Sequence, residues 1–169
     1  MSTPEGRVLK SCLAYDPETG NITNTVKRMG VPVGKQRPRR IPAGYMLFRF
    51  ANRWVYAHRL AYLLMTGDWP PPGLEIDHIN GDPSDNRWVN LRLATRSQNA
   101  ANSVNPRRNT YGRGVLYDSR KKMKRPYSAM IRFEGKRRYL GAFCTAEEAS
   151  AAYESVRKEL YGEFAPKNA

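Results

Sequence analysis

Cysteine is scarce in this chain of 169 residues, and long apolar runs are missing. Cys12 and Cys144 lie far apart and form no Cys-x-x-Cys pair, which excludes a zinc cluster of four cysteines and is typical of a reducing, intracellular setting. No apolar run approaches the roughly 20 residues of a membrane-spanning helix, and the N-terminus shows no signal-peptide pattern. We therefore expect an intracellular protein that has no membrane partner.

Acidic residues are also few. The chain has 15 Asp and Glu against 29 Lys and Arg, which gives a net charge of +14. Basic residues exceed acidic residues in both halves of the chain, a distribution that fits an extended path along a polyanion better than a single basic tail. Because no membrane signal is present, nucleic acid is favoured over an anionic membrane as the partner.

One stretch, residues 74–102, combines a simple local pattern with unusual polar residues. Residues 74–78 alternate apolar and polar side chains as a half-buried strand does, and residues 89–93 alternate again after a turn signal. Thr95 begins a capping box that is typical of the start of a helix. The stretch therefore predicts a strand, a loop, a second strand and a short helix.

Four polar side chains in this stretch suit phosphodiester chemistry. Asp77 and His78 end the first predicted strand, Asn90 follows in the second, and Asn99 lies in the predicted helix. Carboxylate and amide oxygens, together with water and a substrate phosphate, commonly hold Mg²⁺. A histidine, with an ordinary pKa of about 6.5, can take a proton from water near neutral pH, and a metal ion can stabilise charge on the phosphate and leaving oxygen.

These residues and their spacing resemble the HNH endonucleases, in the H-N-N version of the phage and intron homing enzymes. The resemblance implies a ββα-metal unit in which His78 is the general base, Asp77 and Asn99 bind one divalent ion, and Asn90 braces the loop and orients His78. Mg²⁺ and Mn²⁺ are both open, because oxygen ligands accept either ion. The resemblance also implies that the protein hydrolyses duplex DNA and needs no small-molecule cofactor. The alternative is that these residues only shape a turn and a helix end.

The residues before this stretch predict further elements and DNA contacts. A hairpin is expected at residues 45–56 and a helix at residues 58–66, which Gly67 would end. His58, at the start of that helix, is expected to have a structural or phosphate-contacting role. The flanking residues also contain an early turn and strand at residues 15–23, also found in phage HNH proteins, a basic loop at residues 30–44, interpreted as either a DNA-ordered arm or a solvated loop, and two candidate phosphate contacts, Arg59 and Arg87.

A second pattern begins after residues 103–110, which contain Pro106 and no periodicity and therefore predict a linker. We expect its Arg107-Arg108 pair to follow a DNA groove. Three strands and a helix are then predicted at residues 113–117, 127–133, 136–143 and 145–161. They predict a three-stranded antiparallel sheet covered by one helix.

The turn at Glu134-Gly135 sets the predicted register of this sheet. A two-residue turn pairs Phe133 with Lys136 and, further along, Ala129 with Leu140. The same register places three residues on the face away from the helix: Arg132, Arg137 and Tyr139. A short sheet with a basic and aromatic face can enter the major groove of DNA, and a solvated sheet surface is the alternative.

The residues that carry a second resemblance are Tyr111, Arg113-Gly114-Val115, Ala129-x-Ile131-Arg132, Gly135-Lys136, Leu140-Gly141-x-Phe143 and the helix that begins at Thr145. They are similar to the plant ethylene-response-factor (Apetala-type) DNA-binding domain, which also occurs fused to HNH nucleases. The resemblance implies DNA contacts by Arg113, Arg132 and Arg137, and by Tyr139, which stands where that family usually has Trp.

The sequence thus predicts an α+β protein with a nuclease domain at residues 1–102, a linker at 103–110 and a DNA-binding domain at 111–166. The expected function is metal-dependent cleavage of duplex DNA, by a monomer or homodimer, at a site chosen mainly by the second domain. A phage or mobile-element origin would place the protein in a bacterial cytoplasm. A non-catalytic DNA-binding regulator and an RNA-directed protein are the alternatives.

Overall fold

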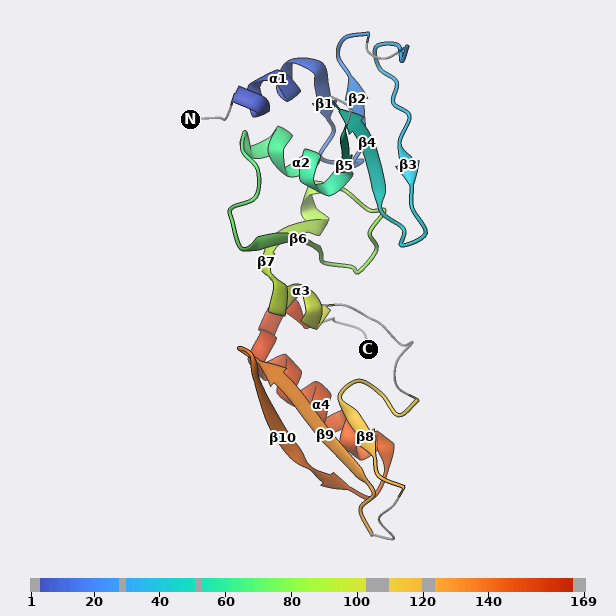
Figure 1. Cartoon of the computed structure of the whole chain (residues 1–169), viewed down its shortest axis with the longest axis vertical. Coiled ribbons are helices and arrows are strands. Elements are labelled where there is room, and N and C mark those ends of the chain that lie inside the picture. The colour runs from blue at the N-terminus through green and yellow to red at the C-terminus, as the bar shows by residue number, and fades with distance from the viewer. Residues whose placement is uncertain (1–3, 28–29, 51–52, 103–109, 120–123, 166–169) are drawn as a thin grey trace. The chain divides into compact units, whose positions relative to one another are not determined.

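The computed structural model describes residues 4–27, 30–50, 53–102, 110–119 and 124–165. Contacts divide the chain into two compact units, residues 1–96 and residues 97–169, and both contain helices and strands (Figure 1). The predicted α+β class is therefore confirmed as a mixed helix and sheet structure. Among the described residues, no helix is long and apolar enough to cross a membrane. The predicted linker lies almost wholly outside the described residues.

The first unit opens with a helix and two small sheets. Its elements are α1 (Pro4–Cys12), β1 (Leu13–Tyr15), β2 (Ile22–Asn24), β3 (Arg39–Arg40), β4 (Met46–Phe50), β5 (Arg53–Tyr56) and α2 (Ala57–Thr66). The predicted hairpin at residues 45–56 is confirmed as the antiparallel pair β4 and β5. The short strand β3, which pairs with β4, falls inside the predicted basic loop.

Helix α2 forms because its apolar residues lie on one side and meet the two small sheets. Leu60 and Leu63 are fully buried in a core that also contains Leu9 and Phe48. Gly67 ends the helix as predicted: it has φ 95°, which favours glycine, and its N–H donates to the carbonyl of Leu63. The chain then leads into the strand that carries Asp77 and His78.

The hairpin of β6 (Leu74–His78) and β7 (Leu91–Thr95) carries the residues of the candidate site. The strands are antiparallel, and Ile76 pairs with Leu93 while His78 pairs with Leu91. The predicted start of the second strand is two residues early, because the 3-10 turn η1 (Trp88–Asn90) occupies that place. The helix α3 (Arg96–Asn102) follows β7 directly.

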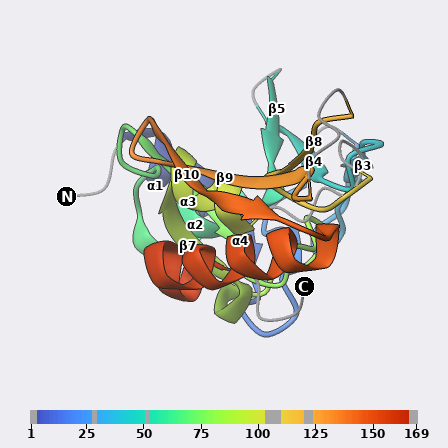
Figure 2. The same ribbon diagram turned by 90° about the horizontal axis from the view of Figure 1, so that it is seen from below.

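The second unit contains the predicted sheet and its covering helix. The strands β8 (Val115–Tyr117), β9 (Tyr127–Phe133) and β10 (Lys136–Phe143) are antiparallel in the order β10-β9-β8. The helix α4 (Ala146–Tyr161), followed by the turn η3 (Gly162–Phe164), lies along one face of this sheet (Figures 1 and 2). The predicted cap is confirmed, because the Thr145 hydroxyl accepts the N–H of Glu148.

The register of β9 and β10 agrees with the prediction at the turn and departs from it further along. Lys136 pairs with Phe133, as expected, and Tyr139 pairs with Met130. The predicted pairing of Ala129 with Leu140 is wrong, because Ala129 pairs with Gly141 after a β-bulge. Leu140 is the extra residue of the bulge and packs against the apolar core beneath α4.

Candidate active site

Asp77 and His78 lie side by side at the end of β6, and both side chains are buried, with 3% and 6% of their surface exposed. Arg92, the partner of Asp77 across the hairpin, donates its Nε to Asp77 Oδ2 at 2.9 Å and places a second nitrogen 2.8 Å from the same oxygen. Burying a carboxylate costs free energy unless a partner of opposite charge and hydrogen bonds offset the loss of water. Arg92 supplies that charge from the same two-stranded sheet.

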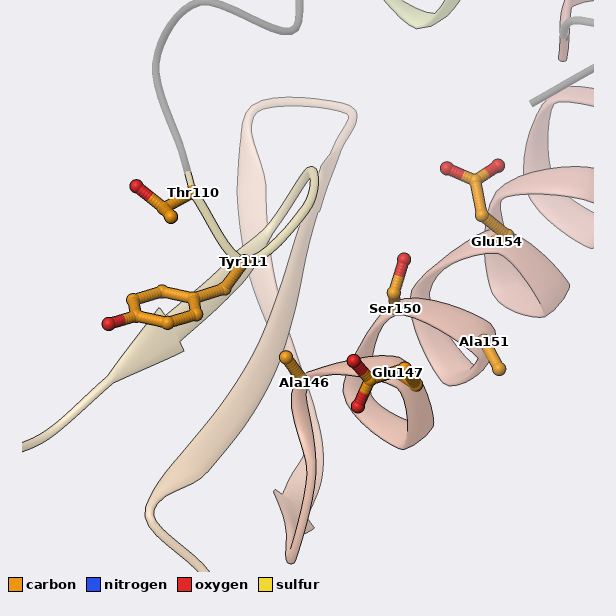
Figure 3. Close-up of a pocket in the computed structure, with 7 residues that line it drawn as sticks. All are labelled: Thr110, Tyr111, Ala146, Glu147, Ser150, Ala151 and Glu154. Carbon is orange, nitrogen blue, oxygen red and sulfur yellow. The ribbon is translucent and has the colours of Figure 1, made fainter.

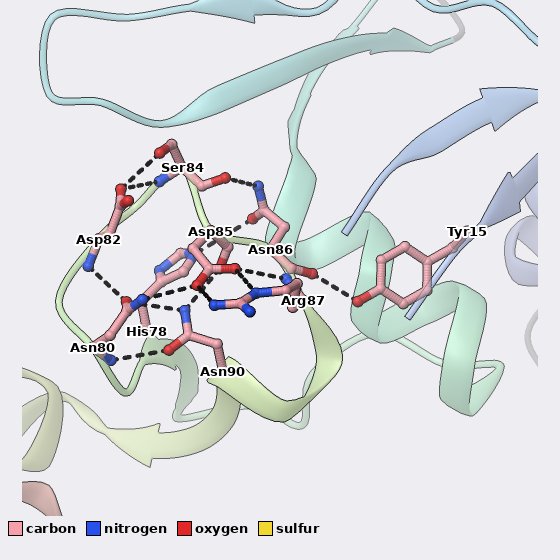
Figure 4. Close-up of polar contacts among 9 residues, drawn as sticks. All are labelled: Tyr15, His78, Asn80, Asp82, Ser84, Asp85, Asn86, Arg87 and Asn90. Atoms are coloured by element: carbon pink, nitrogen blue, oxygen red, sulfur yellow. Dashed lines mark hydrogen bonds and ion pairs between the residues drawn. The ribbon is translucent and has the colours of Figure 1, made fainter. Parts of the chain in front are cut away.

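The His78 ring is held by Asn86, from the loop between β6 and β7 (Figure 4). The ring Nε2 is 3.3 Å from Asn86 Oδ1, and Asn86 Nδ2 donates to the carbonyl of Ser84 at 3.0 Å. Because a carbonyl only accepts, the amide must turn its oxygen toward the ring, and Nε2 must carry the hydrogen. In the neutral ring, Nδ1 then holds the lone pair that can accept a proton.

Asn90 braces the ends of the same loop. Its Oδ1 accepts the N–H of Asn80, and its Nδ2 donates to Asn80 Oδ1 and to the carbonyl of Asp85. The Asn90 carbonyl also accepts the N–H of Ile79. Asn90 therefore links the two ends of the loop, whereas Asn86 contacts the His78 ring.

The turn near the start of the chain, at residues 15–23, contacts the part of this loop that carries Asn86. The Tyr15 hydroxyl donates to the carbonyl of Asn86 at 2.7 Å, and the N–H of Trp88 donates to the carbonyl of Pro17 at 2.9 Å. Gly20 has φ +74°, and a Cβ there would lie 2.6 Å from the carbonyl carbon of Asn86. The turn predicted at residues 15–23 thus has a specific place: it fixes the segment that carries Asn86.

A second histidine, His58, and Tyr45 contact the His78 ring. The His58 ring meets the His78 ring edge-on with centroids 5.1 Å apart, stacks on Tyr56 and contacts Tyr45. Burial lowers the pKa of His58 to about 3, with a smaller contribution from His78. Burial also lowers the pKa of His78, while the hydrogen bond to Asn86 and nearby acidic groups oppose that change. Both rings are therefore favoured in the neutral form at neutral pH.

The acidic residues of the loop are already engaged in local contacts. Asp85 accepts two hydrogen bonds from the Arg87 guanidinium. This side-chain contact is the main reason that the pKa of Asp85 is lowered to about 2. Asp82 accepts two hydrogen bonds from Ser84. The predicted phosphate contact Arg87 remains half exposed, so its guanidinium combines a loop contact with access to solvent.

Comparisons with known proteins identify the domain that contains these residues. Residues 55–101 match a family of HNH endonucleases. The chain is 33% identical over 111 residues to an uncharacterized HNH endonuclease of Acanthamoeba polyphaga mimivirus, which covers 66% of this chain and 56% of that protein. It is 34% identical over 96 residues to Protein 3.8 of Escherichia phage T7, which covers 56% of this chain and 76% of that protein.

Residues 55–101 of the chain therefore form an HNH endonuclease domain. The prediction of an HNH nuclease with viral relatives is thereby confirmed at the level of this domain. The chain spans little more than half the length of the mimivirus relative. No solved structure matches the chain significantly. The family match spans the end of β5, all of α2, β6 and β7 and most of α3, and the three-stranded sheet of β8, β9 and β10 lies outside it.

The HNH motif residues fall in both units. Asp77, His78 and Asn90 belong to the first unit, whereas Asn99, which is half-buried on α3, belongs to the second. Among the described residues, no group of three or more His, Cys, Asp or Glu side chains could hold a metal ion. The buried carboxylate of Asp77 offers the kind of oxygen ligand that a hard cation prefers.

The predicted DNA contacts have different surroundings. Arg132, Arg137 and Tyr139 are exposed on the sheet face away from α4, and Arg59 is exposed with its guanidinium over the Trp69 ring. Arg113 is only partly exposed and donates to carbonyls at the end of α3, a contact that the resemblance did not predict. Arg107 and Arg108 lie outside the described residues.

A hollow of about 390 Å³ lies on the second unit (Figure 3). It is lined by Thr110, Tyr111, Ala146, Glu147, Ser150, Ala151 and Glu154. None of the predicted site residues lines it, and its two carboxylates would repel a phosphate. The candidate active site therefore lies at the β6–β7 loop and not in this hollow.

Proposed function

We propose that this protein is a metal-dependent endonuclease that hydrolyses phosphodiester bonds in duplex DNA, with β6, β7 and α3 as its ββα-metal unit. The observation that carries the proposal is the neutral, buried His78, whose Nε2 hydrogen is held by Asn86 so that Nδ1 can accept a proton. The adjacent buried carboxylate of Asp77 adds the charge that such a centre needs.

Each residue has a separate task in this proposal. His78 takes a proton from the attacking water, and Asn86 keeps the ring in the tautomer that can do so. Asp77 and Asn99 would hold one divalent ion, Mg²⁺ or Mn²⁺. That ion would supply stabilisation of the negative charge on the phosphate and on the leaving oxygen. Asn90 keeps the loop closed, so that His78 and Asp77 remain at the same end of the hairpin.

The second unit would recognise the DNA sequence at which cleavage occurs. Its exposed face offers Arg132, Arg137 and Tyr139 from neighbouring strands, which suits insertion into a major groove. The net charge of +14 supplies affinity for the DNA backbone. We further propose a homing-type role in the bacterial cytoplasm, as a monomer that nicks or a homodimer that cuts both strands.

The decisive experiment incubates the purified protein with supercoiled plasmid and phage DNA in Mg²⁺, Mn²⁺ or EDTA. We expect metal-dependent nicking or linearisation that Asp77→Asn and His78→Ala abolish. Glu75→Gln is the matched control, because Glu75 is an exposed carboxylate on the same strand. Its cleavage should equal that of the wild type.

The alternatives make different predictions in the same assay. Tight DNA binding by the wild type without cleavage in either metal would favour the non-catalytic regulator, for which the Asp77–Arg92 ion pair would be a purely structural feature. Stronger competition by structured RNA than by duplex DNA would redirect the proposal to an RNA substrate. Equal cleavage by the wild type and His78→Ala would exclude His78 as the base.

A further inference from the structure

The helix α3 is too short to be stable alone, and it takes its support from the second unit. Isolated helices below about 12 residues are marginal in water, so a seven-residue helix depends on tertiary contacts. Ala101 and Asn102 are buried, with 4% and 3% of their surface exposed. Ala101 belongs to the core formed by residues of β8, β9 and α4, such as Val115 and Tyr153.

Two arginines bind the carbonyl end of α3. Arg157 donates its Nε to the carbonyl of Ala101 at 3.1 Å and adds a second hydrogen bond from its terminal nitrogen. Arg113 donates to the same carbonyl at 3.1 Å and to the carbonyl of Ala100. The last carbonyls of a helix have no partner within the helix and carry partial negative charge. Two guanidinium groups therefore satisfy them with charge-assisted hydrogen bonds.

Arg157 is the charged member of the buried face of α4, whose other buried residues are Ala149, Tyr153 and Tyr161. Only 2% of its surface is exposed, and its remaining nitrogen makes two hydrogen bonds of 2.8 Å to the Glu154 carboxylate. A buried ion pair often stabilises a fold no better than apolar residues would, but it fixes geometry because every hydrogen bond has a direction. All three nitrogens of Arg157 are used, and two of them hold α3.

The other end of α3 has a contact of its own. Ser97 Oγ is 3.2 Å from the Tyr161 hydroxyl, which donates its hydrogen to the carbonyl of Arg132 at 2.7 Å. Because that hydrogen is already used, Ser97 is the donor in the first contact. The helix is therefore fastened at both ends to residues of the second unit.

We propose that Arg113 and Arg157 are positioning residues for Asn99, because they fix the helix α3 within the second unit. This inference rests on the proposed function, because Asn99 matters only if it binds the metal. Asn99 lies one and two residues before the bonded carbonyls of Ala100 and Ala101. Holding those carbonyls fixes the rotation of the helix about its axis, and with it the direction of the Asn99 side chain.

The test uses the full chain with Arg157→Lys, which keeps the charge but not the forked geometry, and Arg113→Met, which removes a less buried arginine. We expect the Mn²⁺ concentration for half-maximal cleavage to rise roughly tenfold, in the range seen when residues that support metal ligands are changed. DNA affinity in EDTA should stay near that of the wild type. Arg137→Met is the matched control, because its exposed guanidinium should affect DNA affinity and not the metal requirement.

Hydrogen exchange at the amides of residues 97–102 separates the two proposals. Unchanged protection in both variants, with melting temperatures near that of the wild type, would overturn the positioning role whether or not the protein is a nuclease. Lower protection with an unchanged Mn²⁺ requirement would overturn it as well. A loss of DNA affinity in Arg113→Met, with the Mn²⁺ requirement unchanged, would return that residue to the DNA-contacting role. Lower protection in a chain whose wild type neither binds Mn²⁺ nor cleaves would refute the proposed function and leave the two arginines with a structural role in holding α3.

Discussion

The His78 ring depends on a single amide for its orientation. Asn86 Oδ1 accepts from Nε2, and the Asn86 amide is fixed in turn by the carbonyl of Ser84. The sequence predicted His78 and Asn90 from residue type and spacing, but it did not predict Asn86. Nothing in a polar loop indicates which of several asparagines turns inward, and only the closed loop shows that Asn86 is 5% exposed.

Replacing Asn86 should impair the chemistry more than DNA binding. In Asn86→Leu the ring loses the acceptor that selects its tautomer, and we expect the cleavage rate to fall roughly 10- to 100-fold. Single-turnover cleavage at saturating protein measures the change. Asn21→Leu, at an exposed asparagine, is the control. A variant at position 86 that keeps half of the wild-type rate would show that the ring is oriented by other contacts.

His58 should make the stability of the protein sensitive to acid. Its pKa is lowered to about 3, so the unfolded chain takes up the proton more readily than the folded chain. The stabilising contribution is complete above the ordinary pKa of about 6.5 and is lost as the pH falls toward 3. His78 acts in the same direction, because its pKa is also lowered.

We therefore expect the free energy of unfolding to fall by up to about 1.4 kcal/mol for each histidine and each pH unit below about pH 6. His58→Phe keeps an aromatic ring in the cluster and removes one titrating group, so its decline should be shallower. Urea unfolding at neutral and mildly acidic pH measures both slopes. Identical slopes in the two proteins would contradict the assignment of the effect to His58.

At the scale of elements, the sequence predicted where strands and helices lie better than how they meet. Alternating side chains and turn signals located β4, β5, β6, β9 and β10. The start of β7 was wrong because a 3-10 turn uses Asn90 for the loop before the strand begins. The predicted pairing of Ala129 with Leu140 was wrong because the β-bulge has a tertiary cause: Leu140 packs into the core while Gly141 adopts φ +136°.

The turn behind the active-site loop should be sensitive to one added methyl group. Gly20→Ala would force a left-handed backbone on an L-residue and bring its Cβ against the backbone of Asn86. We expect a loss of stability above about 1 kcal/mol, together with reduced cleavage. Gly73→Ala is the control, since Gly73 has φ +83° and no atom within 4 Å of the added Cβ. Thermal unfolding of both variants separates backbone strain from the clash, and equal losses would show that the clash does not matter.

At the scale of the whole molecule, the positive charge should govern how DNA affinity responds to salt. The binding constant should fall steeply with salt, and each lost phosphate contact should reduce the slope by about 0.9. Arg132→Met and Arg137→Met should weaken binding to the preferred sequence more than binding to random DNA if these residues contact bases. Titrations at several salt concentrations measure both effects. An equal loss on all sequences would assign these arginines to the phosphate backbone.

The two arginines that bind the last carbonyls of α3, Arg113 and Arg157, also limit how such proteins can be recombined. A cut after Asn102 would leave the carbonyls of Ala100 and Ala101 without Arg113 and Arg157. A chimaera that joins this nuclease motif to another DNA-binding module would therefore need a replacement for both cations. Exchange of target specificity by module shuffling is then constrained by one short helix, because a join in the linker would separate α3 from the two arginines that bind its last carbonyls.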